Sequence, residues 1–178
     1  AVAGHTVDVT PAEFEAVVAE VWIPVQRYLR RRLDAATADD VLSDVLLVMW
    51  RRRAELPDEP LPWCYGVARR CMANALRGDQ RRLRLVDRIA AQAPPALTGE
   101  DDALAEALSS LAEADRELLR LWAWEGLAPR ELAAVLDITP NAASIRLHRA
   151  TKRLRTALGK TRGGAGHRRL RQGEEAPR

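Results

Sequence analysis

The sequence has few of the residues that build disulfide frameworks, metal centres and redox sites. Its 178 residues include only two cysteines and three histidines. Cys64 and Cys71 lie seven positions apart in a segment with helical periodicity, where a rise of about 1.5 Å per residue separates them too far for a disulfide. His5, His148 and His167 are scattered, and no phosphate-binding loop or nucleophile arrangement is present. These absences argue against an enzyme, predict no metal or cofactor, and fit a reducing cytoplasm.

Long apolar runs are absent as well. The clearest run, Val45 to Trp50, is far shorter than the roughly 20 residues that span a bilayer. The first residues lack the pattern of a secretory signal, and because residue 1 is alanine we expect a processed or trimmed N-terminus. No segment alternates apolar and polar residues for long enough to predict a β-strand. The apolar residues instead recur every three or four positions, which predicts an all-α protein.

Charge is distributed unevenly along the chain. Residues 1–139 carry 17 Lys+Arg against 23 Asp+Glu, a net charge of −6, whereas residues 140–178 carry 11 against 2, a net charge of +9. Residues 69–88 form another basic segment, with seven arginines against two aspartates. A solvated helix face is the simplest explanation of either segment alone. Two separate basic segments on an acidic body nevertheless predict two contacts with a polyanion.

Three helices are predicted in the first half of the chain. The segment Thr10-Pro11-Ala12-Glu13 combines an N-cap threonine, a proline at the first helical position and the glutamate of a capping box. Apolar periodicity predicts that this helix ends near Leu33, that a second ends at Trp50, and that a third runs from about Trp63 into the arginine-rich tract. The proline-rich segment 55–62 is predicted to be a loop.

The chain as a whole is predicted to form two small helical domains joined by a flexible linker. The first domain covers residues 10–88, the linker residues 89–101, and the second domain residues 102–158. The linker contains a proline pair and a glycine and has no sustained period. The glycine- and arginine-rich residues 159–178 are expected to be a disordered basic tail.

The segment PRELAAVLDITPNAASIRLHRATKRL has the pattern of a helix-turn-helix. Asp137 stands where the turn often has glycine, and aspartate tolerates the left-handed backbone better than most residues. Thr139 is the predicted N-cap of the second helix, and Pro140 is its predicted first residue.

The second helix of this pair has two distinct faces. At about 100° per residue, one face collects Ala143, Leu147, Ala150 and Leu154 and should be buried. Ile145 lies on the opposite, polar face, where it suits a thymine methyl group, and Arg149 there suits guanine. Further candidates for DNA contact on this face and its flank, mostly to phosphates, are Asn141, Arg146, His148, Lys152 and Arg153. The alternative is a charged helix that meets only water or another protein.

Two segments in the first half of the chain indicate which kind of helix-turn-helix protein this is. The two segments read ADDVLSDVLLVMWRRRAEL and PWCYGVARRCMANALRGDQRR. They resemble regions 2.2 to 2.4 of sigma-70-family RNA polymerase sigma factors, specifically the extracytoplasmic-function (ECF) group. Region 4 of that group is similar to a segment of the second half, LAEADRELLRLWAWEGLAPRELAAVLDITPNAASIRLHRATKRLR. The resemblance covers residues 14–84 and 104–157 in the same order. It implies a promoter-specificity subunit that binds core RNA polymerase and promoter DNA at −10 and −35 elements, with an anti-sigma factor as a further partner.

The resemblance also implies roles for individual residues. The helix at residues 39–50 would dock on the clamp helices of the polymerase β′ subunit, while region 4 would meet the β subunit. The implied polymerase contacts are Asp40, Val41, Ser43, Asp44 and Leu47. The implied −10 contacts are Arg69, Arg70, Asn74, Arg77, Arg81 and Arg82. The implied base-contacting positions at the −35 element are Ser144, Ile145, His148 and Arg149.

Some positions differ from the family pattern or are expected to be structural. Ser43 replaces a usual Gln and Arg70 a usual Asn, so the polymerase contact and the base preference are expected to differ from those of better-known members. Trp63, Tyr65 and the two cysteines are expected in the core, because aromatic side chains and free thiols are mostly buried.

An alternative function is a free-standing helix-turn-helix regulator. In that case the N-terminal domain would sense a ligand or dimerise, and the protein would bind an operator without polymerase. A sigma factor would instead bind duplex DNA weakly by itself and recognise a promoter once core polymerase is present.

Overall fold

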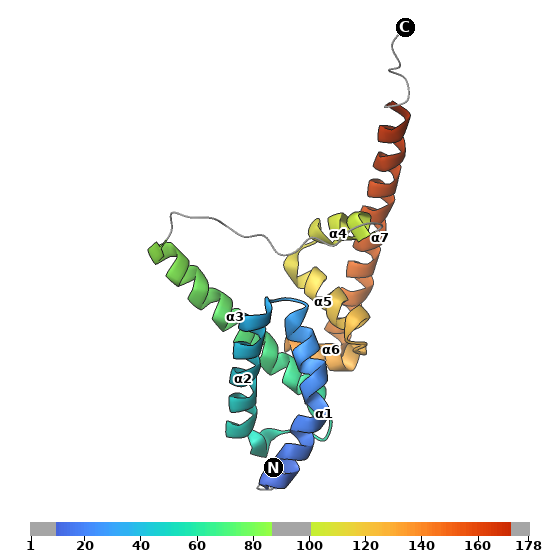
Figure 1. The fold of residues 1–178 in the computed structure, drawn as a ribbon. Helices are drawn as coiled ribbons and strands as arrows, with labels where there is room; N and C mark the ends of the chain where they lie inside the picture. The colour runs from blue at the N-terminus through green and yellow to red at the C-terminus, as the bar shows by residue number, and fades with distance from the viewer. Residues whose placement is uncertain (1–9, 87–100, 172–178) are drawn as a thin grey trace. The chain divides into compact units, whose positions relative to one another are not determined.

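The computed structural model describes residues 10–86 and 101–171, and every regular element in these ranges is helical (Figure 1). The all-α prediction is therefore confirmed. The chain divides into two compact units. The first comprises Ala1–Ala90 with Ala133–Ile138, and the second comprises Ala91–Leu132 with Thr139–Arg178. Side chains are described to residue 78 in the first unit and from 103 to 160 in the second.

The first unit is built on three helices that pack against one another: α1 (Pro11–Arg30), α2 (Ala35–Arg51) and α3 (Pro60–Val86). The short 3-10 helix η1 (Arg53–Glu55) lies between α2 and α3. The predicted capping box begins α1: the Glu13 amide donates to Thr10 Oγ1 at 3.3 Å, and the Thr10 amide donates to Glu13 Oε2 at 2.8 Å. These bonds satisfy amide groups that have no acceptor within the helix.

The core of this unit lies where the apolar faces of α1, α2 and α3 meet. In this core the ring centroids of Tyr28 in α1 and Tyr65 in α3 are 5.3 Å apart. Outside it, the ring centroids of Phe14 and the exposed Trp50 are 5.1 Å apart. Burial of these faces removes apolar surface from water and supplies the main driving force for packing. The buried apolar residues are Val21, Val25, Tyr28, Leu29, Ala38, Val41, Leu42, Val45, Met49, Cys64, Tyr65, Val67 and Ala68.

Two helix boundaries in this unit differ from the prediction. The predicted loop 55–62 is shorter, because α3 already begins at Pro60 and has Pro62 in its first turn. Proline is well tolerated there, since the first amide groups of a helix have no intrahelical acceptor to lose. The first helix ends at Arg30 instead of near Leu33, with Arg31 as its C-cap.

The second unit is built around a long helix. Helices α4 (Asp101–Ser109) and α5 (Glu113–Trp124) pack against α7 (Pro140–Arg171), and α6 (Pro129–Leu136) precedes α7 along the chain. Buried side chains of α5 and α7 include Leu118, Leu121, Ala143 and Ala150. The small alanines of α7 allow neighbouring helices to approach closely, so α7 is fixed by packing over its first three turns.

The expected disorder of the basic tail is wrong for residues 159–171, because α7 continues to Arg171. These residues contain no proline and include four arginines, which favour a helix. Their four glycines cost about 1 kcal/mol each relative to alanine, but extending an existing helix avoids the cost of nucleation. Residues 172–178 lie outside the described ranges. None of the described helices has the length and apolar character needed to cross a membrane.

Candidate nucleic-acid interface

The turn between α6 and α7 has the predicted geometry. Asp137 adopts a left-handed backbone, with φ of 56°, and the amide of Ile138 donates to the carbonyl of Ala133 at 3.1 Å. Thr139 Oγ1 then accepts from the amide of Ala142 at 3.2 Å, so Thr139 caps α7. Because the helix begins at Pro140, the side chains that follow have a defined phase around its axis.

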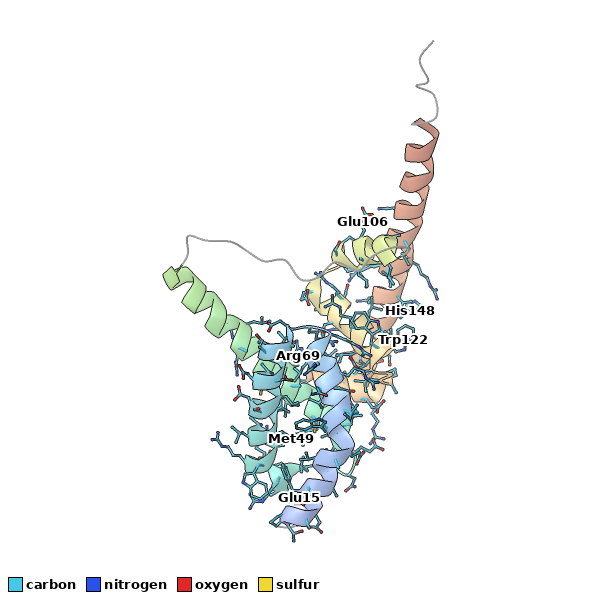
Figure 2. The ribbon with its side chains drawn as sticks, viewed as in Figure 1. Glu15, Met49, Arg69, Glu106, Trp122 and His148 are labelled. Atoms are coloured by element: carbon cyan, nitrogen blue, oxygen red, sulfur yellow. The ribbon has the colours of Figure 1, made fainter. Side chains whose placement is uncertain are left out.

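The two faces of α7 also agree with the prediction. Ala143 and Ala150 are fully buried, and Leu147 and Leu154 are half-buried. Ile145 is 43% exposed although it is apolar. Figure 2 shows the labelled His148 on α7. The residues exposed with Ile145 are Asn141, Ser144, Arg146, His148, Arg149, Lys152 and Arg153, so all eight predicted −35 contacts are accessible.

Arg153 nevertheless differs from the other predicted phosphate contacts. Its guanidinium forms an ion pair with the carboxylate of Asp115 in α5. The two residues are 38 positions apart, so sequence spacing alone did not indicate the pair. The cation predicted to bind phosphate is therefore occupied within the protein, whereas no ion pair joins Lys152 to any side chain that the structure describes. Asp115 is the functional candidate that the sequence did not reveal.

The cationic residues of α3 form a second exposed surface. Arg69, Arg70, Asn74 and Arg77 are all exposed, and Arg77 Nη2 donates to Asn74 Oδ1 at 2.6 Å. Positions 70, 74 and 77 follow the spacing of one helix face, and Figure 2 labels Arg69 on the same helix. Arg81 and Arg82 belong to α3, but their side chains lie outside the described part of the chain.

The aromatic residues and cysteines of α3 divide between core and edge. Tyr65 is buried as predicted, whereas Trp63 is only half-buried and has the Arg52 guanidinium 5.4 Å from its ring centroid. Burial raises the pKa of the Cys64 thiol to about 12, so it is not a nucleophile at neutral pH. Burial also raises the pKa of the half-buried Cys71. No trio of His, Cys, Asp or Glu side chains within the described ranges could hold a metal ion.

The acidic face of α2 is distinct from the helix cap. Asp34 caps α2 by accepting from the amide of Thr37 at 3.1 Å, so Asp40 and Asp44 are not needed at the N-terminus. Asp40 and Asp44 also lie beyond the first turn of α2, where attraction to the helix dipole is weak. Asp39 is paired with Arg30 at 3.0 Å. Among described residues, neither Asp40 nor Asp44 has an ion-pair partner.

The other predicted polymerase contacts of α2 are placed differently from one another. Leu47 is 52% exposed, and Ser43 is exposed with its hydroxyl donating to the carbonyl of Asp39 at 3.1 Å. Val41 is only 1% exposed, so it lies in the core of the unit and not on the surface that Asp40 and Asp44 share. Helical geometry turns Val41 about 100° away from Asp40, into the core between the helices.

Comparisons with known proteins identify the family. A family model described as Sigma-70, region 4 matches residues 101–154. The chain is 34% identical over 161 residues to RNA polymerase sigma factor CarQ of Myxococcus xanthus, covering 82% of this chain and 89% of that protein. The chain belongs to the sigma-70 family, in its ECF group. The sigma factor is also 27% identical over 141 residues to ECF RNA polymerase sigma factor SigL of Mycobacterium tuberculosis, covering 73% of this chain and 79% of the relative.

Solved structures of low sequence identity share the fold of this sigma factor. RpoE of Bartonella quintana, solved with the anti-sigma factor NepR, aligns with a TM-score of 0.62 and 19% identity over 83% of this chain and 97% of that chain. CnrH, solved with the cytosolic domain of CnrY, aligns with a TM-score of 0.59 and 21% identity over 87% and 93%. These structures show the fold alone, whereas the relationship to CarQ and the region 4 match make the protein a promoter-specificity factor that directs transcription initiation.

Proposed function

We propose that three exposed helix faces divide the work of this sigma factor. The face of α7 binds the −35 element, the cationic face of α3 binds the −10 element, and the acidic face of α2 binds core polymerase. The domains that carry these faces are residues 10–88 and 102–158, joined by the linker 89–101. The observation that carries the proposal is the α7 face, where an exposed Ile145 lies among polar and cationic side chains.

The −35 contact follows from the chemistry of the major groove. Arg149 donates two parallel hydrogen bonds to guanine, and Ile145 packs against a thymine methyl group. Ser144, His148 and Asn141 lie on the same accessible part of α7 and supply further donors and acceptors. Arg146 and Lys152 bind phosphates and set the register of the helix on the duplex.

The −10 contact uses a longer cationic face. Arg69, Arg70 and Arg77 neutralise the phosphates of the melted strand, and Asn74 hydrogen-bonds to an exposed base edge. The bond from Arg77 to Asn74 orients the amide so that its nitrogen stays available as a donor. Arg81 and Arg82 continue the cationic tract along the same helix.

The polymerase contact uses Asp40, Ser43, Asp44 and Leu47. Two exposed carboxylates and an apolar side chain on one helix face fit a basic partner surface with an apolar centre, as the clamp helices of β′ would provide. Region 4 would contact the β subunit. Because RpoE was solved with the anti-sigma factor NepR, we propose that an anti-sigma factor also binds this protein. The protein would act in the cytoplasm as a regulator and not as an enzyme.

The test is run-off transcription with purified core polymerase over a promoter library. We expect promoter-specific transcripts that require the wild-type protein and are lost when Asp40 and Asp44 are both replaced by arginine. A variant with arginine at the exposed Glu15 of α1 is the control, because it reverses one charge in the same unit outside the proposed contact. Operator binding that needs no polymerase, together with failure to bind core polymerase, would instead support a free-standing regulator.

A further inference from the structure

An ion pair ties the DNA-facing helix to its neighbour in the second unit. Asp115 lies in the first turn of α5, and Arg153 lies on α7. The Asp115 side chain is only 15% exposed, whereas the Arg153 side chain is 60% exposed. Because little water reaches the carboxylate, its attraction for the guanidinium is screened less than in a fully exposed pair. We therefore expect the pair to persist in solution.

The pair lies in a pocket that also contains the carboxylate of Glu106. This pocket of about 770 Å³ is lined by Arg149, Lys152, Arg153 and Lys160 of α7, with Asp115 on its α5 side. Lys152 and Arg153 are consecutive residues, and both are exposed. Only Arg153 of these two is neutralised by a described carboxylate. Two adjacent cations of α7 therefore differ in whether an ion pair within the protein holds them.

We propose that Asp115 is a specificity-determining residue that withholds Arg153 from DNA phosphates. This inference rests on the proposed role of α7 in binding DNA. A phosphate contact strengthens binding to every sequence equally, because it carries no base information. By occupying one cation, Asp115 lowers the affinity of α7 for bulk DNA and leaves the base contacts of Ile145 and Arg149 unchanged. The ion pair therefore reduces binding to nonspecific DNA sites and makes promoter binding more dependent on polymerase.

The mechanism makes a quantitative prediction about salt. Each phosphate that a protein neutralises adds about 0.9 to the magnitude of the slope of log K against log salt concentration. Release of Arg153 from Asp115 should add one such contact. The Arg153 side chain is already 60% exposed in the pair, so its release requires no rearrangement of the core.

The experiment measures binding of the full-length protein to a fluorescein-labelled duplex of arbitrary sequence, about three helical turns long, between about 50 and 200 mM NaCl. We expect Asp115→Asn to bind more tightly at low salt and to have a slope steeper by about 0.9. Over this salt range, its affinity should fall by an additional factor of about 3 to 4 relative to the wild type. The double variant Asp115→Asn with Arg153→Gln should return to the wild-type slope.

Glu113→Gln is the matched control. Glu113 begins the same helix and its loss removes the same charge from the same helix end, but its partner is Arg116 at 3.0 Å and not a residue of α7. Its slope should equal that of the wild type. A general effect of net charge would instead steepen the slope of both variants and would overturn the proposal.

Arg153→Gln keeps the proposal testable even where Asp115→Asn impairs folding, which circular dichroism would detect. If Arg153 is withheld, Arg153→Gln should leave the wild-type slope unchanged, whereas Lys152→Gln should lower its magnitude by about 0.9. Equal reductions in both variants would overturn the proposal. A wild-type slope near zero would overturn the DNA-binding role of α7 itself, and so the two failures are distinguishable.

Discussion

Helices α2 and α7 present similar surfaces of opposite charge. On α2, the exposed carboxylates of Asp40 and Asp44 share a helix face with Leu47, which is 52% exposed. On α7, cationic side chains such as Arg149 surround Ile145, which is 43% exposed. The charge selects the class of partner, a basic protein surface in one case and a polyanion in the other. The exposed apolar residue adds a contact that requires a complementary apolar surface on the partner.

On each helix, some charged residues form contacts within the protein, and others of the same charge remain available to a partner. On α2, Asp34 caps the helix and Asp39 pairs with Arg30, which leaves Asp40 and Asp44 for a partner. On α7, Arg153 pairs with Asp115. Net charge therefore overstates the binding surface of each helix, because part of the charge stabilises the fold.

The largest expected effect comes from reversing the charge of the α2 surface. The variant Asp40→Arg with Asp44→Arg should lower affinity for core polymerase by about 100-fold or more, because like charges brought together cost several kcal/mol. Binding of labelled protein to core polymerase measures this effect. Duplex DNA binding by the isolated protein should not weaken. Unchanged polymerase affinity would contradict the role assigned to α2.

The second effect concerns base recognition by α7. Arg149→Ala should reduce the preference for a −35 sequence over a scrambled duplex by about 1 to 3 kcal/mol, through loss of a bidentate contact to guanine. Competition binding in the presence of core polymerase gives this preference. If affinity falls equally for both duplexes, Arg149 is a phosphate contact and not a base contact.

A smaller and sequence-independent effect is expected at the neighbouring phosphate contact. Lys152→Gln should weaken binding to specific and scrambled duplexes alike and lower the magnitude of the salt slope by about 0.9. Titrations at several salt concentrations separate this result from that of Arg149→Ala. A change in sequence preference would contradict the assignment of Lys152 to phosphate.

The smallest expected effect is a pH dependence of Tm that comes from the carboxylates at the N-termini of α1 and α2. Hydrogen bonds from Thr37 lower the pKa of Asp34 below its usual 3.8, and those from Thr10 lower the pKa of Glu13 below its usual 4.5. Carboxyl groups with a lowered folded-state pKa stabilise the fold above their unfolded pKa, and this stabilisation is lost as pH falls through the folded pKa. The wild-type Tm should therefore fall as pH drops below about 4.5.

Asp34→Asn is the variant that tests the origin of this fall. Asparagine retains the N-cap but does not titrate, so the variant should show a shallower loss of Tm between neutral and acidic pH. Thermal unfolding followed by circular dichroism across this range measures the difference. An identical pH dependence in both proteins would show that Asp34 does not contribute to it.

Local features were predictable from the sequence because they depend on neighbouring residues. The capping box at Thr10, the left-handed Asp137 and the cap at Thr139 each involve interactions over at most three positions. The buried and exposed faces of α7 followed from its helical period. The start of α3 and the extent of α7 were not predicted, because proline and glycine content favours loops without deciding where an existing helix stops.

The sequence by itself determined the family, the helical character and the exposed face of α7, because helix periodicity, caps and turns are encoded within a few consecutive residues. Only the tertiary structure decided which residues of these helices are available. Val41 is buried because α1 and α3 pack against α2, and Arg153 is paired because α5 brings Asp115 to α7 from 38 positions away. Burial and ion pairing between distant segments depend on packing, which no local spacing specifies.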